Sequence, residues 1–368
     1  MMKDKEKRVF NKNFIVMSLL LSSVLALSLL FMNIGEQKSV LANEKHANNE
    51  RLKVYAGGDN IGVKISIEGV LVVSFSDIES VDGKIIKSPA QSSGINIGDT
   101  ILSVDGKSIN TSKELVKNVN ESETGTVAVK VNRDGSEIIK NVNLLKNNLG
   151  NYKLGMWVRD STAGIGTLTF VDENTGVYGG LGHPITDSET ERVLSVLKGD
   201  LIRSTVINVR KGEVGSPGEL KGIFTNEKMP IGTVGKNTET GIFGVVDAKN
   251  MNRFNESSKL YEIGFKNEVQ EGNAQIITTT DEQGPKFYDI SIEKVIGTAK
   301  GPNKNMLIKV TDEELLAKTG GIVQGMSGSP IIQNGRIIGA VTHVLVNKPN
   351  VGYGIYIENM LNDANLIK

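Results

Sequence analysis

The 368-residue chain has no cysteine, one tryptophan and only three histidines. Without cysteine, disulfides, thiol catalysis and cysteine-ligated metal sites are excluded. Lysine plus arginine and aspartate plus glutamate both number 42, so the zero formal charge gives no electrostatic reason to expect a nucleic-acid partner. Scattered histidines without an H-E-x-x-H motif make a poor metal site, and a Walker phosphate loop is also missing. We therefore expect neither a metal nor a cofactor.

The longest apolar run lies near the N-terminus, where residues 14–34 contain no charged side chain. About 20 apolar residues are enough to span a bilayer as a helix. Basic residues dominate residues 3–12, which favours a cytoplasmic N-terminus and an exported remainder. The alternative is a cleaved signal peptide with a small-residue site at 40-VLA-42. We expect a basic tail and single-pass anchor over residues 1–35, followed by a polar tether over 36–53.

A PDZ domain is predicted over residues 54–147. The segment 88-SPAQSSGINIGDTILSVDGKSI-109 resembles the bacterial PDZ pattern of S-P-A, a glycine, and then G-D-x-I-L-x-V-(D/N)-G. Such domains capture a peptide C-terminus with backbone N–H groups and add the peptide as a strand. The upstream residues Ile61, Gly62 and Val63 are the predicted carboxylate-binding loop; the alternative is that Gly62 only makes a tight turn.

Local signals in the same segment predict one helix and one hairpin. Ser112 is a candidate cap for a helix over 113–121. Asp134 and Gly135 separate two β-rich runs and predict a hairpin turn.

Residues 148–368 contain many short β-like runs separated by turns rich in Gly, Asn and Asp. This pattern is typical of a β-barrel or sandwich domain, and the length suffices for two six-stranded barrels. One helix is expected at 312–318. The overall fold prediction is mainly β: an N-terminal transmembrane helix, an α+β PDZ domain, and then a chymotrypsin-like double β-barrel.

The stretch 325-GMSGSP-330 matches the G-x-S-G-x-P pattern that surrounds the nucleophile of chymotrypsin-like serine peptidases. A tight turn would lift the Ser327 hydroxyl out of the backbone, and the N–H groups of Gly325 and Ser327 would form an oxyanion hole. Ser329 has no glycine two residues before it and is expected to be a bystander. A glycine-rich segment at 160-DSTAGIG-166 is a minor rival for the nucleophile.

A serine nucleophile needs a base and an acid that orients it. His183 lies among glycines and before Pro184, which favours a presented side chain over the strand residue His343. His343 is the alternative base, or a residue that lines the site. For the acid, Asp312 competes with Asp187 and Asp172, and Asp312 is equally suited to capping a helix.

The chain as a whole resembles the stage IV sporulation protein B family of membrane-anchored signalling peptidases. The resemblance rests on 157-WVRDSTAGIGTLTF-170, 179-GGLGHPITD-187, 310-VTDEELLAKTGGIVQGMSGSPIIQNGRIIGAVTH-343 and 352-GYGIYIENML-361. It implies a triad of His183, Asp312 and Ser327. The chain departs from the family at Gly180 and Pro184, where alanine and glycine are frequent, and Pro184 restricts the backbone of His183.

The resemblance also implies partners and a location. Such a protein would cut itself near its N-terminus and then cleave a membrane-bound regulator, which triggers sigma-factor activation between the forespore and mother cell. Its protein domains would lie in the space between the two membranes. Two other functions stay open from the residues alone: a PDZ adaptor with an inactive peptidase-like domain, and an HtrA-like quality-control protease.

Overall fold

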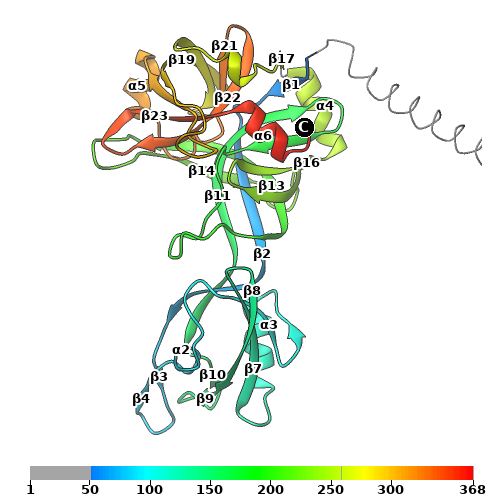
Figure 1. Ribbon diagram of the computed structural model, residues 1–368, viewed down its shortest axis with the longest axis vertical. Coiled ribbons are helices and arrows are strands. Elements are labelled where there is room, and N and C mark those ends of the chain that lie inside the picture. The colour runs from blue at the N-terminus through cyan, green and yellow to red at the C-terminus, as the bar shows by residue number, and fades with distance from the viewer. Residues whose placement is uncertain (1–50, 258, 368) are drawn as a thin grey trace, which may run out of the picture. The chain divides into compact units, whose positions relative to one another are not determined.

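A computed structural model describes residues 51–257 and 259–367. The predicted anchor and most of the tether lie outside these residues. Across the described ranges, no helix is long and apolar enough to cross a membrane. The described chain is mainly β, as predicted, and folds into a PDZ lobe and two barrels (Figure 1).

The first barrel is a closed ring of six antiparallel strands. Its order is β11 (Met156–Asp172), β12 (Val177–Gly180), β16 (Gly241–Val246), β15 (Gly232–Thr238), β13 (Val196–Arg210) and β2 (Asn60–Phe75), with β2 pairing back onto β11. β1 (Lys53–Ala56) joins β11 to β17 (Leu260–Glu262), and β14 (Glu219–Thr225) extends β13. Buried residues such as Ile65, Leu168 and Tyr178 fill the barrel.

Two long strands, β2 and β11, belong to both the first barrel and the PDZ lobe. Residues 61–66 of β2 pair with 161–166 of β11 in the barrel, and residues 71–75 pair with 156–159 in the PDZ lobe. Figure 1 shows both strands running from one lobe into the other. The PDZ lobe is therefore an insertion in the first barrel. This differs from the predicted boundary at residue 54, because residues 53–67 pair with barrel strands.

The PDZ lobe packs two helices, α2 (Pro89–Ser92) and α3 (Ser112–Asn120), against a small sheet. The sheet contains the ends of β2 and β11 with β5 (Thr100–Val104), β6 (Lys107–Ser108), β7 (Thr126–Arg133) and β8 (Ser136–Asn143). Two short pairs complete the lobe: β3 (Ile78–Glu79) with β4 (Ile85–Ile86), and β9 (Leu145–Lys146) with β10 (Tyr152–Lys153).

The local predictions in this lobe are confirmed with one shift. The β7–β8 hairpin turns at Asp134 and Gly135, which have φ of 52° and 83°. Helix α3 begins one residue earlier than predicted, because its cap is Thr111. The Thr111 hydroxyl accepts from the Glu114 N–H, and the Glu114 carboxylate accepts from the Thr111 N–H, which forms a capping box.

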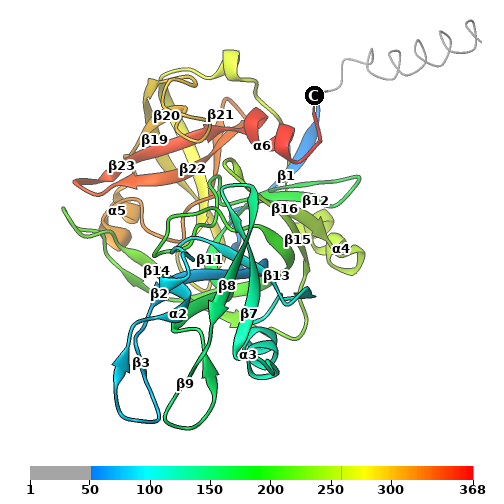
Figure 2. The same cartoon turned by 60° about the horizontal axis from the view of Figure 1, so that its bottom comes forward.

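The second barrel is also a closed ring of six strands (Figure 2). Its order is β18 (Gly272–Thr279), β19 (Pro285–Val295), β20 (Met306–Val310), β23 (Lys348–Tyr356), β22 (Arg336–Leu345) and β21 (Pro330–Gln333). The β21–β22 hairpin turns at Asn334 and Gly335, an Asn-Gly pair that favours the positive φ of such turns. Four short helical elements surround the barrels: α4 (Ala248–Ser257), η1 (Lys266–Glu268), α5 (Glu313–Thr319) and α6 (Ile357–Asp363).

The inserted PDZ lobe leads to a prediction about excision. Replacing residues 68–159 with a two-residue Asn-Gly turn should leave folded barrels, because Ser66 and Ser161 are already paired neighbours. We expect a single cooperative thermal transition by circular dichroism. Removing residues 54–147 instead is the control; it deletes most of β1 and all of β2, and should abolish the folded state. Equal loss of structure in both deletions would contradict the insertion.

Candidate active site

The loop carrying Ser327 connects α5 to β21, and we call residues 320–329 the nucleophile loop. Gly325 and Gly328 have φ of +97° and +96°, a region that favours glycine. A Cβ at Gly328 would lie 2.1 Å from the carbonyl oxygen of Thr167 and 2.5 Å from the nitrogen of Leu181. Glycine at 328 therefore lets this loop of the second barrel pack directly against the backbone of the first barrel.

Strand β11 holds the nucleophile loop through two buried threonines. The Thr167 hydroxyl donates to the Gly325 carbonyl at 2.8 Å, and the Thr167 N–H donates to the Ser327 carbonyl at 2.9 Å. The Thr169 hydroxyl donates to the Gly328 carbonyl at 2.7 Å. Hydrogen bonds to buried groups are costly to lose, so these three bonds fix the loop. Neither threonine was identified from the sequence, since 165-IGTLTFVD-172 reads only as a strand.

The predicted oxyanion donors keep their N–H groups available. Among the described residues, neither the Gly325 N–H nor the Ser327 N–H has a hydrogen-bond acceptor, whereas the N–H groups of Gln324, Met326 and Gly328 are all bonded. The carbonyls of the same two residues accept from Thr167, so β11 holds the backbone of the loop on both sides of Met326. Two free donors flanking a nucleophile are what an oxyanion hole requires.

His183 follows β12 through a turn in which Leu181 and Gly182 have φ of 67° and 70°. Its ring Nδ1 lies 2.8 Å from the Pro184 carbonyl oxygen. A carbonyl only accepts, so the proton belongs on Nδ1, which leaves Nε2 as the basic nitrogen. Burial lowers the pKa of His183, and the Pro184 hydrogen bond opposes that shift. At neutral pH the side chain is therefore an uncharged base.

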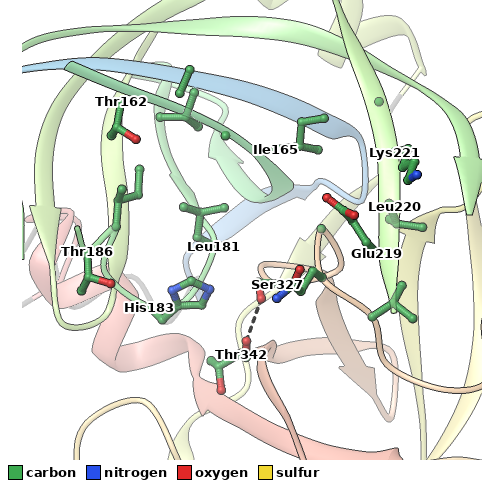
Figure 3. A pocket seen from close by; sticks show the side chains of 18 of the residues that line it. Thr162, Ile165, Leu181, His183, Thr186, Glu219, Leu220, Lys221, Ser327 and Thr342 are labelled. Atoms are coloured by element: carbon green, nitrogen blue, oxygen red, sulfur yellow. Dashed lines mark hydrogen bonds between the residues drawn. The ribbon is translucent and has the colours of Figure 1, made fainter. Parts of the chain in front are cut away.

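One cavity of about 1060 Å³ contains both His183 and Ser327, which come from different barrels. Figure 3 shows the two side chains projecting into the same hollow. The Ser327 hydroxyl donates to the carbonyl of Thr342 at 2.7 Å, so in this arrangement it is not engaged by the histidine. The constellation offers a nucleophile, a neutral base and two oxyanion donors; acyl transfer needs the serine hydroxyl to turn toward the base.

Asp312 is not brought to His183. Its carboxylate caps α5, where one oxygen accepts from the Leu315 N–H at 2.9 Å and the other from the Asp289 N–H at 3.3 Å. Asp312 does not line the cavity that contains His183. The structure thus favours the capping alternative over the triad role that the family resemblance implies.

The two other candidate acids also have local roles. Asp187 is buried; it binds the N–H groups of Glu189 and Thr190 and pairs with Arg159 at 2.9 Å. Asp172 binds the N–H and hydroxyl of Thr175 in the β11–β12 turn. His343 lies beside His183, with a distance of 5.0 Å between the two ring centroids.

The predicted peptide loop at Ile61, Gly62 and Val63 is not a loop. These residues lie near the start of β2, with β11 on one side and β13 on the other. Strand pairing uses their backbone groups, so they have none to offer a peptide carboxylate. Their apolar–Gly–apolar pattern reflects a crowded strand, since a Cβ at Gly62 would lie 2.7 Å from the Phe224 ring.

A groove in the PDZ lobe lies between α3 and the start of β11. It encloses about 430 Å³ and is lined by Leu115, Val116 and Val119 of α3 and by residues 152–158. The latter segment contains Leu154-Gly155-Met156, a second apolar–Gly–apolar pattern that sequence reasoning passed over. In the described part of the chain, the N–H groups of Leu154 and Gly155 have no hydrogen-bond acceptor. These residues suit a carboxylate-binding loop at the C-terminal end of the lobe, in place of the one predicted at residues 61–63.

Two protein families match parts of the chain. Residues 150–361 match the family described as SpoIVB peptidase S55. Residues 61–144 match the PDZ domain family.

Among solved structures, the PDZ domain of the SdrC-like protein from Listeria monocytogenes is 21% identical, with a TM-score of 0.20, and the match covers 26% of this chain and 90% of that one. The HtrA-type protease AlgW with decapeptide is 11% identical, with coverage of 56% and 53% and a TM-score of 0.33. The Rv3671c protease from M. tuberculosis in its active form is 11% identical, with coverage of 56% and 76% and a TM-score of 0.31.

The contacts of Asp312 lead to a prediction that separates capping from catalysis. Asp312→Asn keeps a good cap and should keep kcat within about tenfold of wild type, because asparagine caps as well as aspartate. Asp312→Ala should lower the free energy of unfolding by about 1 kcal/mol. Denaturant unfolding and casein hydrolysis measure the two effects. A folded Asp312→Asn variant that has lost almost all activity would restore Asp312 to the triad.

Proposed function

The chain belongs to the SpoIVB peptidase S55 family and is a serine peptidase, and from that premise we propose that it is a self-cleaving signalling endopeptidase of sporulation. Its target would be a membrane-bound regulator whose cleavage triggers sigma-factor activation. The observation that carries the catalytic part is the cavity that joins His183 of the first barrel to Ser327 of the second. The family match carries the biological part.

The proposed chemistry is acyl transfer from the scissile peptide to Ser327. The Ser327 oxygen attacks the carbonyl carbon while Nε2 of His183 takes the hydroxyl proton. The N–H groups of Gly325 and Ser327 donate to the oxygen that becomes negative. His183 then gives its proton to the leaving amine, and water, activated by the same nitrogen, releases the acyl group.

The PDZ lobe would recruit the protein substrate through the groove beside α3. Val116 and Trp157 line this groove and are 53% and 65% exposed. Exposed apolar walls beside free backbone donors suit a peptide with an apolar side chain and a terminal carboxylate. This supports a protein partner, with recognition separated from cleavage.

The proposed location is extracytoplasmic, between the forespore and mother-cell membranes, with residues 14–34 as the anchor. The polar residues 36–50, together with the start of the described chain, are the proposed site of self-cleavage. That segment has no apolar periodicity and precedes β1. Cutting there would release the folded lobes from the anchor.

Two alternatives make different predictions. A PDZ adaptor with an inactive peptidase domain would keep its biological output when Ser327 is removed. An HtrA-like quality-control protease would degrade unfolded proteins broadly. The available oxyanion donors and the uncharged His183 favour an active enzyme over the adaptor.

Replacing the nucleophile tests the enzyme. Ser327→Ala in the full chain should abolish labelling by a fluorophosphonate probe and abolish new N-termini mapped by mass spectrometry, because no hydroxyl remains to be acylated. Ser329→Ala is the matched control: its buried hydroxyl donates to the Met326 carbonyl, so labelling should persist. Self-cleavage that continues in Ser327→Ala would reject Ser327 as the nucleophile.

A second measurement tests the groove. The peptide Gly-Gly-Ser-Val-Val with a free carboxylate should bind the full Ser327→Ala chain roughly tenfold tighter than its C-terminal amide, because the amide has lost the charge that backbone donors bind. Val116→Glu should weaken binding of the free acid by charge repulsion. Ile139→Glu, at an exposed apolar residue that does not line the groove, is the control. Equal affinity for the acid and the amide, measured by calorimetry, would reject the groove.

A further inference from the structure

The segment that carries the catalytic base is a loop closed at its neck. It connects β12 to β13, and we call residues 181–195 the base loop. Its two arms meet where the Leu194 N–H donates to the Ile185 carbonyl at 3.2 Å. His183 lies two residues before this meeting point, so its place in the cavity depends on how the neck of the loop is held.

One side chain of β15 binds both arms of the base loop at the neck. The Nδ2 group of Asn237 donates to the Ile185 carbonyl at 2.8 Å and to the Leu194 carbonyl at 2.9 Å. The Oδ1 atom of Asn237 accepts from the Ile185 N–H at 2.8 Å. A carboxamide has two N–H donors and one acceptor oxygen, so all three groups of this side chain bind the base loop.

The peptide unit between Pro184 and Ile185 connects Asn237 to the base. Its N–H donates to Oδ1 of Asn237, and its carbonyl oxygen lies 2.8 Å from Nδ1 of His183. A peptide unit is planar, so a group that fixes the direction of the N–H also fixes the direction of the carbonyl. Asn237 therefore holds the backbone that follows His183 and the carbonyl that the imidazole binds.

A β-bulge in β15 turns Asn237 toward the base loop. The pairing of β15 with β16 shifts between Val234 and Lys236, which makes Gly235 the extra residue. Val234 is buried in the first barrel, and strand alternation without a bulge would place Lys236 on the same face. Lys236 is instead exposed and donates to the Asp363 carbonyl. The bulge thus gives the inward position to Asn237, which alternation alone would assign to the outer face.

We propose that Asn237 is a positioning residue for the catalytic base. It holds the neck of the base loop so that His183 stays in the cavity with Ser327 (Figure 3). Asn237 does not line that cavity, so it acts through the loop and does not touch the substrate. Its role is additional to that of any acid that completes the triad, because the imidazole can exchange the Pro184 carbonyl for a carboxylate while the loop keeps its backbone. The proposal rests on the proposed peptidase activity.

Two matched substitutions in the full chain test this role. Asn237→Leu has a similar volume but no hydrogen-bonding group, so kcat for casein should fall roughly 10²-fold with KM little changed, because a small displacement of a catalytic group has an effect of that size. Asn305→Leu is the control, since Asn305 is fully buried, binds the backbone of Gly297, Gly301 and Tyr356, and does not line the cavity. It should lower the melting temperature at least as much as Asn237→Leu and keep the kcat of wild type.

The rate at which a fluorophosphonate probe labels Ser327 is a second readout, because it reports the nucleophile and base without substrate recognition. Labelling of Asn237→Leu should slow by a factor similar to the fall in kcat. Asn237→Asp keeps the acceptor for the Ile185 N–H, but its second oxygen faces the carbonyls of Ile185 and Leu194. Its kcat and labelling rate should therefore lie between those of wild type and Asn237→Leu.

The outcomes distinguish this proposal from the peptidase assignment. If wild type cleaves casein no faster than Ser327→Ala, the peptidase assignment fails, and the proposal with it. If wild type is active and Asn237→Leu keeps its kcat and labelling rate, only the positioning role is overturned. An equal loss of kcat in Asn305→Leu also overturns it, because activity would then follow stability alone. If Asn237→Leu does not fold by circular dichroism, Asn237→Asp decides, and a wild-type kcat in that variant overturns the proposal.

Discussion

The catalytic geometry depends on the contact between β11 and the nucleophile loop. Thr167 and Thr169 of the first barrel bind three carbonyls of a loop in the second barrel. In the described residues, the N–H groups of Gly325 and Ser327 in this loop have no acceptor, and Ser327 lines the cavity with His183. It also explains Gly328, because any side chain there would collide with the backbone of Thr167. One strand therefore joins the barrels and shapes the site.

The same strand begins in the PDZ lobe. Met156 and Trp157 line the groove beside α3, and Ala163, Gly164 and Ile165 line the active-site cavity. The strands β2 and β11 belong to both the lobe and the barrel, so the groove and the active-site cavity lie along continuous strands. A separate PDZ domain on a linker would lack this connection.

Local features were predictable because their causes are local. The Asp134-Gly135 and Asn334-Gly335 turns require positive φ, and both hairpins occur where the residues place them. Ser327 and His183 could be selected because glycine-rich surroundings mark presented side chains. The role of Asp312 could not be decided, since a helix cap and a triad acid have the same local pattern. The prediction of a peptide-binding loop at Ile61–Val63 was wrong. Glycine occurs at position 62 because the ring of Phe224 packs closely against it, and Phe224 lies 162 positions further along the chain.

The sequence by itself determined the mainly β class, the PDZ pattern and the family resemblance, and it selected Ser327 and His183, which the structure places in one cavity. Each depends on residue order within a short segment. Only the tertiary structure decided that the PDZ lobe is inserted between β2 and β11, that a groove lies beside Leu154 and Gly155, and that His343 stands beside His183. Those facts depend on pairing and packing between segments far apart in the chain, which no local pattern encodes.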